Sequence, residues 1–211
     1  GSAACRGILW RGLFLTRGSY PIERIRAHLL RQRITSACRL IWTRHADNPL
    51  ATRLTRSRFC DGKTSTVLYA AQSFETAFIE VIVCDRFVLK GRRDIPYGEL
   101  ALRTWLRLAT RSDEMLNLLD LRGTGCVDIG APTDTIHARN QAAGRALAAA
   151  IHSQHASVDG LVYPSRLTGA DCFAVFARAS SKLEVVEQGP VAVHDGLPDV
   201  LQQHNLGLIV E

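Results

Sequence analysis

The sequence has 211 residues, of which 46% are hydrophobic and 22% charged, as in a soluble globular protein of one ordinary domain. No stretch approaches the about 18 continuous apolar residues of a membrane span, and the basic start lacks the apolar core of a secretion signal. We therefore expect a cytoplasmic protein without membrane contact. The net charge of +6 is uneven, because residues 1–60 hold twelve arginines and only two acidic residues. Such an excess suits a nucleic acid, an acidic protein or a polyanionic small molecule, and equally a solvated basic face.

The first third of the chain predicts a basic amphipathic helix over residues 21–41, with a proline in its first turn. Residues 40–44 form a short strand candidate, and the polar, Arg-rich residues 45–65 are typical of a loop. We therefore expect a single globular unit in which residues 1–39 form a basic N-terminal helical extension and residues 40–211 the main domain.

The remaining pattern mixes short strands with two helices. A strand is expected at 67–71, followed by a helix that Ser73 caps, and a long Ala-rich helix is expected from Thr133 to about Ser153. Residues 85–115 carry mixed signals. Further strands are expected at residues 117–121, 158–163, 172–176, 183–186 and, as an edge strand, 206–210. This order lacks a strict β-α-β rhythm and therefore favours an α+β fold.

The cysteines and histidines are scattered without the paired spacing that zinc ligands show. His152 and His155 come closest, but no cysteine or carboxylate accompanies them. We expect no metal site and reduced cysteines, as in a cytosolic protein. Cys84 and Cys172 lie in apolar runs and are expected in the core. No glycine-rich phosphate loop follows a strand, which disfavours Rossmann and P-loop enzymes.

Glu80 stands out because it lies within residues 73–84, an apolar stretch that otherwise predicts a buried helix. On a helix it shares a face with residues three and four positions away, and none of these is Lys or Arg. Burying an unpaired carboxylate is costly unless its pKa shifts. A cation, a hydrogen-bonding network or a substrate would compensate; a carboxylate at the helix rim, paired with a distant arginine, fits the local sequence equally well.

Other polar residues stand in a characteristic order around Glu80. Arg44 closes a predicted strand, Arg58 lies in the following loop, and Tyr69 precedes Glu80 by eleven positions. Ser165 ends a second block, about ninety residues after the first, in which it follows a Tyr-Pro pair.

This order and spacing resemble the RES domain family, named for its Arg, Glu and Ser, from about residue 40 to residue 176. The family's arginine before the tyrosine normally sits in a Gly-Gly-Arg-Trp-Asn-like run. Here the run reads Arg56-Ser57-Arg58-Phe59-Cys60, which lacks the glycines and the Asn. The resemblance implies an α+β fold like that of ADP-ribosyltransferase toxins, with mixed, mainly antiparallel sheets packed with helices and residues 40–211 as the catalytic domain.

The resemblance also implies a toxin that cleaves NAD+ as its substrate and is paired with an Xre-like antitoxin. The implied catalytic residues are Glu80, Arg44 and Ser165. Breaking the nicotinamide–ribose bond develops positive charge on the sugar, which a carboxylate at Glu80 would stabilise. Arg44 would bind the pyrophosphate through its planar guanidinium.

The implied substrate-binding residues are Arg44, Arg58, Tyr69, His45 and Ser165. Arg58 would share the pyrophosphate with Arg44, and Tyr69 would stack on the nicotinamide ring. Ser165 and His45 would contact ribose or phosphate oxygens. For each of these side chains an ordinary structural role, such as a solvated arginine, a core tyrosine or a turn serine, fits the local sequence as well.

Three functions remain open at this point. The first is an NAD-depleting toxin that uses water or phosphate as acceptor. The second is a protein ADP-ribosyltransferase with the same site and a protein acceptor. The third, and most distant, is a nucleic-acid-binding module that uses the basic first third, although its aromatic residues are not patterned as base readers. The identity of the antitoxin and the formation of a homo-oligomer are not decided by the sequence.

Overall fold

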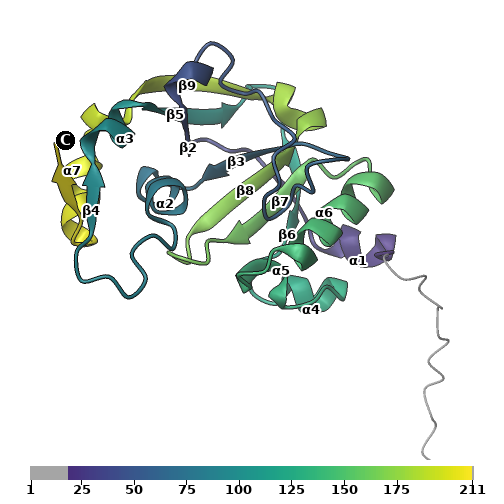
Figure 1. Ribbon diagram of the computed structural model, residues 1–211. Coiled ribbons are helices and arrows are strands. Elements are labelled where there is room, and N and C mark those ends of the chain that lie inside the picture. The colour runs from purple at the N-terminus through teal and green to yellow at the C-terminus, as the bar shows by residue number, and fades with distance from the viewer. Residues whose placement is uncertain (1–18, 211) are drawn as a thin grey trace, which may run out of the picture.

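A computed structural model describes residues 19–210, and Figure 1 shows a curved central sheet with helices gathered at its two ends. Across this eight-stranded sheet the order is β1 (Leu29–Gln32), β6 (Leu116–Asp120), β7 (Gly160–Pro164), β8 (Asp171–Phe176), β3 (Val67–Ala71), β2 (Ala37–Trp42), β5 (Arg103–Thr110) and β9 (Leu183–Pro190). Neighbouring strands are antiparallel except for β6 and β7. Strands β4 (Asp94–Pro96) and β10 (Gly207–Ile209) form a separate parallel pair. The α+β class with a mainly antiparallel sheet is therefore confirmed.

The helices divide into two groups and one central element. One group consists of α1 (Ile22–Ala27), α4 (Gly125–Ile129), α5 (Asp134–His137) and α6 (Ala142–Gln154). The other consists of α3 (Tyr97–Ala101) and α7 (Leu197–Gln203), which lie with β4 and β10 at the opposite end of the molecule (Figure 1). Between them lies α2 (Phe74–Phe78), which continues as the π-helix η2 (Ile79–Val83). Short 3₁₀ turns are η1 (Thr43–His45), η3 (Ala177–Lys182) and η4 (Val191–Val193).

Strand β5 shows the alternation of buried and partly exposed residues that is typical of a strand in a sheet. In β5 every second residue is buried, namely Thr104, Leu106, Leu108 and Thr110, as expected for a strand of period two. The two sheet faces carry separate apolar clusters: Leu68 belongs to one and its neighbour Val67 to the other. Within residues 19–210 no helix has the length and apolar character needed to cross a bilayer.

Two of the predicted helices are wrong in extent. The helix expected over residues 21–41 ends at Ala27, because the following residues pair as β1 with β6 and as β2 with β5. Tertiary pairing therefore overrides the local helical pattern. The helix expected from Thr133 to Ser153 is broken between α5 and α6, where the side chain of Asn140 accepts a hydrogen bond from the backbone N–H of Ala142. The part of the predicted extension before residue 19 lies outside the described residues.

Cys84 is exposed, so its expected place in the core is also wrong, whereas Cys172 is buried as predicted. Strands 67–71 and 172–176 and the Ser73-capped helix start are confirmed by β3, β8 and α2. Residues 85–115, whose sequence signals were mixed, contain β4, α3 and β5.

Candidate active site

The helix that carries Glu80 changes from α to π winding at Ile79, one residue before it. Ser73 Oγ accepts a hydrogen bond from the Thr76 N–H and starts α2. The chain then widens into η2, where the Cys84 N–H donates to the Ile79 carbonyl at 2.7 Å, a bond across five residues. Ile79 faces the core while Glu80 is half-buried. Single π turns of this kind occur frequently at functional sites.

Ser165 holds one oxygen of the Glu80 carboxylate. Its hydroxyl donates to Glu80 Oε1 at 2.5 Å and accepts the backbone N–H groups of Leu167 and Thr168, both at 3.1 Å. The serine side chain is thereby fully committed and only 2% exposed. Among residues 19–210, no donor is bonded to Glu80 Oε2 and no basic side chain forms an ion pair with this carboxylate. The second oxygen is therefore open to a ligand.

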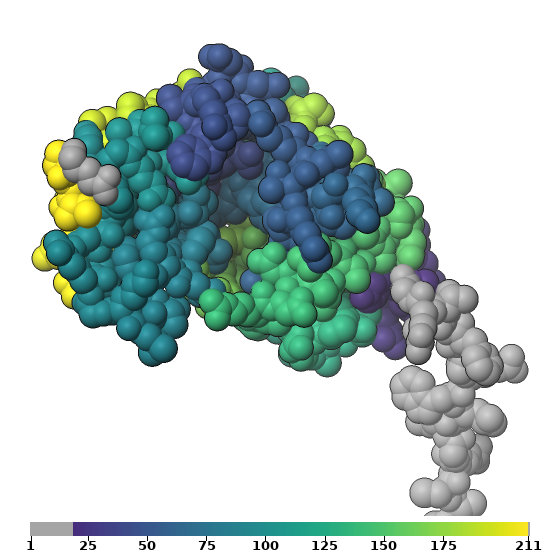
Figure 2. Space-filling view, viewed as in Figure 1, coloured from purple at the N-terminus to yellow at the C-terminus, as the bar shows by residue number. Residues whose placement is uncertain are grey.

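A cleft of about 540 Å³ lies in front of Glu80, within the about 300–1,000 Å³ usual for ligand sites. Figure 2 shows the hollow between the blue loop 45–66, the teal segment after η2 and the green residues of α5 and α6. We call it the Glu80 cleft. Its walls include Arg39, Arg58, Tyr69, Tyr163 and Arg166.

Small side chains make room for the cleft. Cys38 and Cys172 are both register partners of Ala71, so the three lie side by side on β2, β8 and β3. All three line the Glu80 cleft. Burial, and to a smaller extent the charge of Glu80, raises the pKa of the Cys172 thiol to about 12. The cleft floor is therefore formed by neutral, compact groups.

Arg39 is the most confined cation of the site. Its guanidinium donates to the Tyr69 carbonyl at 3.0 Å and to the Ala51 carbonyl at 3.4 Å, while its buried Nε has no partner among the described residues. Burial lowers the pKa of Arg39 to about 10, which leaves it charged at neutral pH. A charged side chain with an unused donor at a cleft wall is suited to an anion.

Arg58 reaches the cleft from the neighbouring loop. Its Nη1 donates to the Ala138 carbonyl at 3.1 Å and so connects the loop to the break between α5 and α6. Gly144 of α6 permits this approach, because a Cβ there would lie 2.6 Å from the Arg58 carbonyl oxygen. The half-buried Arg58 is therefore held at its guanidinium by the Ala138 carbonyl and at its backbone by the close approach of α6.

Tyr69 separates the Glu80 cleft from a second, smaller pocket. Its hydroxyl accepts the Phe59 N–H at 2.8 Å and is bonded to Ser57 Oγ at 2.9 Å. Burial raises the pKa of Tyr69 to about 12. The phenol is therefore neutral and fixed.

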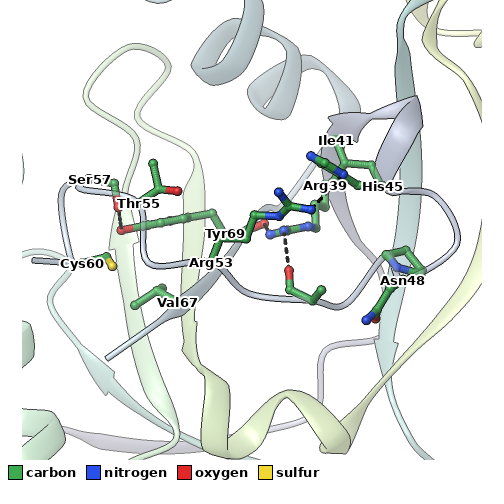
Figure 3. Close-up of a pocket in the computed structure, with 12 residues that line it drawn as sticks. Arg39, Ile41, His45, Asn48, Arg53, Thr55, Ser57, Cys60, Val67 and Tyr69 are labelled. Carbon is green, nitrogen blue, oxygen red and sulfur yellow. Dashed lines mark hydrogen bonds between the residues drawn. The ribbon is translucent and has the colours of Figure 1, made fainter. Parts of the chain in front are cut away.

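The second pocket, the His45 pocket, has about 250 Å³ and shares Arg39, Ser57 and Tyr69 with the Glu80 cleft. Figure 3 shows His45 on its right-hand side and the Ser57–Tyr69 pair at the opposite end. His45 Nδ1 lies 3.0 Å from Arg53 Nη2. The two hollows adjoin along Arg39 and Tyr69, and together they offer space for an elongated ligand.

The structure brings four of the predicted site residues together: Glu80, Ser165, Arg58 and Tyr69. His45 lies in the adjoining pocket.

Arg44 lines neither hollow. It is exposed on η1, with its guanidinium 5.5 Å from the Trp42 ring centroid and its Nε directed to His45. The sequence interpretation missed Arg39, which lines both hollows. Its signal was present, because an arginine between the apolar Cys38 and Leu40 is as unusual as Glu80 in its helix.

The RES domain profile matches residues 30–194. The chain belongs to the RES domain family. Its match extends from β1 to η4 and thus covers nearly the whole central sheet.

One relative supports this assignment, and one solved structure shares the fold. The chain is 30% identical over 120 residues, 56% of its own length and 94% of the relative's, to "Probable toxin y4kH" of Sinorhizobium fredii (strain NBRC 101917 / NGR234). The crystal structure of the M. tuberculosis MbcT–MbcA toxin–antitoxin complex is similar with a TM-score of 0.62 and 17% identity, over 80% of this chain and 90% of that chain. The predicted RES fold is thereby confirmed.

Proposed function

We propose that this RES domain is a toxin-type enzyme that cleaves the nicotinamide–ribose bond of NAD+. The observation that carries the proposal is the Glu80 carboxylate, with one oxygen held by Ser165 and the other open to a cleft that Arg39 and Arg58 flank. Membership of a family that includes a probable toxin, and the resemblance to NAD-cleaving enzymes, agree with it.

In the proposed reaction Glu80 acts on the developing sugar cation. As the bond to nicotinamide lengthens, its electron pair leaves with the ring, which departs neutral, and positive charge spreads over the ribose. Glu80 Oε2 accepts hydrogen bonds from the ribose hydroxyls and stabilises that charge, more effectively in a half-closed cleft than in water. Ser165 keeps the carboxylate in one orientation, so the charge is stabilised by a preorganised group.

The remaining residues hold the dinucleotide. The pyrophosphate needs planar cationic donors, which Arg39 and Arg58 offer from the walls of the cleft. The Tyr69 ring is a rigid wall against which an aromatic base can stack. Arg44 stays a candidate for the outer end of the substrate.

The acceptor decides which product forms. Water gives ADP-ribose, phosphate gives its 1-phosphate ester, and a protein side chain gives a modified protein. Purified protein incubated with NAD+ should release nicotinamide, and mass spectrometry of the ADP-ribose moiety distinguishes the three outcomes. A folded protein that releases no nicotinamide under any of these conditions would rule out the proposed function.

The partner is proposed on the same grounds. Because the M. tuberculosis structure contains a toxin with its antitoxin, we expect an antitoxin protein, of the Xre-like kind, to neutralise this chain. Expression of the wild type alone should arrest growth of a host, and co-expression of the antitoxin should restore it. Growth that continues at full rate with soluble, folded toxin contradicts the toxin assignment.

A further inference from the structure

The helix that carries Glu80 is fastened to the turn that carries Ser165 by more than the bond between those two residues. Thr76 Oγ1 lies 3.3 Å from Thr168 Oγ1 near the start of the helix. Beyond the other end of η2, Arg166 Nη2 donates to both oxygens of Asp85, each at 2.9 Å. The Glu80–Ser165 bond therefore lies between two further polar contacts that join the same two segments.

The Asp85–Arg166 pair lies close in sequence to the Glu80–Ser165 pair. Arg166 directly follows Ser165, and Asp85 comes directly after Cys84, where the π turn ends. Cys84 has a φ of 46°, a backbone conformation that non-glycine residues seldom adopt. This turn directs the chain so that Asp85 meets Arg166. Strained backbone that persists at the edge of a cleft indicates that the geometry serves the site.

The pair is poorly suited to a purely stabilising role. Both side chains are 29% exposed, and ion pairs with this exposure add little to folding stability. The bond from Arg166 lowers the pKa of Asp85, and Arg139, 80% exposed at 3.6 Å, contributes further. The charge on Asp85 is therefore retained at neutral pH, which keeps the contact to Arg166 closed.

We propose that Asp85 is a positioning residue, which acts through Arg166 to hold the Ser165 turn against the Glu80 helix. The proposal rests on the proposed function of Glu80. If Asp85 and Arg166 act through their mutual contact, removing either side chain should increase the mobility of the Glu80 carboxylate to the same extent. Misplacement of a reacting group by about 1 Å can cost about 100-fold in rate. The effect falls on kcat, because Glu80 acts on the transition state more than on the bound substrate.

The test compares Asp85→Asn, Arg166→Gln and the double variant in nicotinamide release. We expect each single variant to lower kcat by about 10- to 100-fold with a much smaller change in KM. The double variant should be no slower than the worse single variant, because either substitution alone already removes the Asp85–Arg166 contact. Asp85→Glu should restore part of kcat. Glu187→Gln is the matched control, since it removes a similar 2.9 Å pair with Arg107 on β5 and β9.

Additive losses in the double variant, or a loss expressed in KM alone, would overturn the proposal and assign Asp85 a direct contact with substrate. A second measurement does not depend on activity. In the turn, the Gly169 N–H donates to the Ser165 carbonyl at 2.9 Å. Amide hydrogen exchange of residues 167–169 should rise about ten-fold or more in Asp85→Asn but not in Glu187→Gln. Unchanged exchange would refute the proposal that the Asp85–Arg166 contact holds the Ser165 turn. An inactive wild type with the expected exchange would refute only the proposed function.

Discussion

Replacing Ser165 by alanine removes three hydrogen bonds at one buried atom. The Glu80 carboxylate loses its 2.5 Å donor, and the N–H groups of Leu167 and Thr168 lose their acceptor. An unsatisfied buried group costs about 1–3 kcal/mol. The carboxylate is half-buried and can bind water from the cleft, so most of the cost comes from the two N–H groups. We expect Ser165→Ala to lower the free energy of unfolding by about 2–4 kcal/mol.

The same substitution should reduce catalysis without removing it. Glu80 keeps its charge but loses the contact that fixes its orientation, so we expect kcat for nicotinamide release to fall about ten-fold or more. Urea unfolding measures the stability, and steady-state kinetics at a temperature where the variant is folded measure the rate. Ser153→Ala is the matched control, because that hydroxyl is exposed and bonds only within α6.

Equal behaviour of Ser165→Ala and Ser153→Ala would refute the role given to the Ser165 hydroxyl. A Ser165 variant whose stability lies within about 0.5 kcal/mol of the wild type, as is usual for surface substitutions, would contradict the three bonds. A complete loss of activity equal to that of a Glu80 variant would give Ser165 a direct role in the reaction.

Three further predictions use other parts of the structure. Arg39→Lys should raise the Kd for NAD+ measured by calorimetry about ten-fold or more, and Arg44→Lys should raise it less, because only Arg39 lines the Glu80 cleft; the reverse order would restore Arg44 as the clamp. Gly144→Ala should lower the melting temperature and displace Arg58, despite a gain in helix propensity of about 1 kcal/mol, because its Cβ would lie 2.6 Å from the Arg58 oxygen; a stabilised variant refutes the close approach. Burial lowers the pKa of His194 below 6.5, so the unfolded chain binds the proton more readily and stability should fall as pH drops through 6.5; an unchanged pH slope in His194→Phe contradicts this.

The sequence predicted the elements whose pattern is local. Strand 67–71 and the Ser73 cap follow from an apolar run and a single side chain, and both appear at the predicted residues. The π turn at Glu80 had no such signal, because its extra residue is accommodated by packing of η2. The helix predicted over residues 21–41 failed for the converse reason, since β1 gains its partner from residues almost ninety positions away.

The sequence predicted individual residues of the candidate site but not the contacts between them. Glu80 attracted attention through its unusual surroundings, and Ser165 through the resemblance. Their direct bond depends on how η2 and the turn after β7 meet, which spacing alone does not give. The choice between Arg44 and Arg39 depends on where β2 ends, because Arg39 lies within the strand and lines the cleft, whereas Arg44 follows the strand on η1 and does not.

In the proposed reaction the Glu80 carboxylate stabilises the sugar cation that forms as the bond between nicotinamide and ribose breaks. The most direct measurement is the amount of nicotinamide released from saturating NAD+ by wild type and by Glu80→Gln, with NAD+ binding measured on both. We expect rapid release by the wild type, a loss of about 100-fold or more in the variant, and similar Kd values. Equal rates for the two proteins, or no release by the folded wild type, would contradict the account.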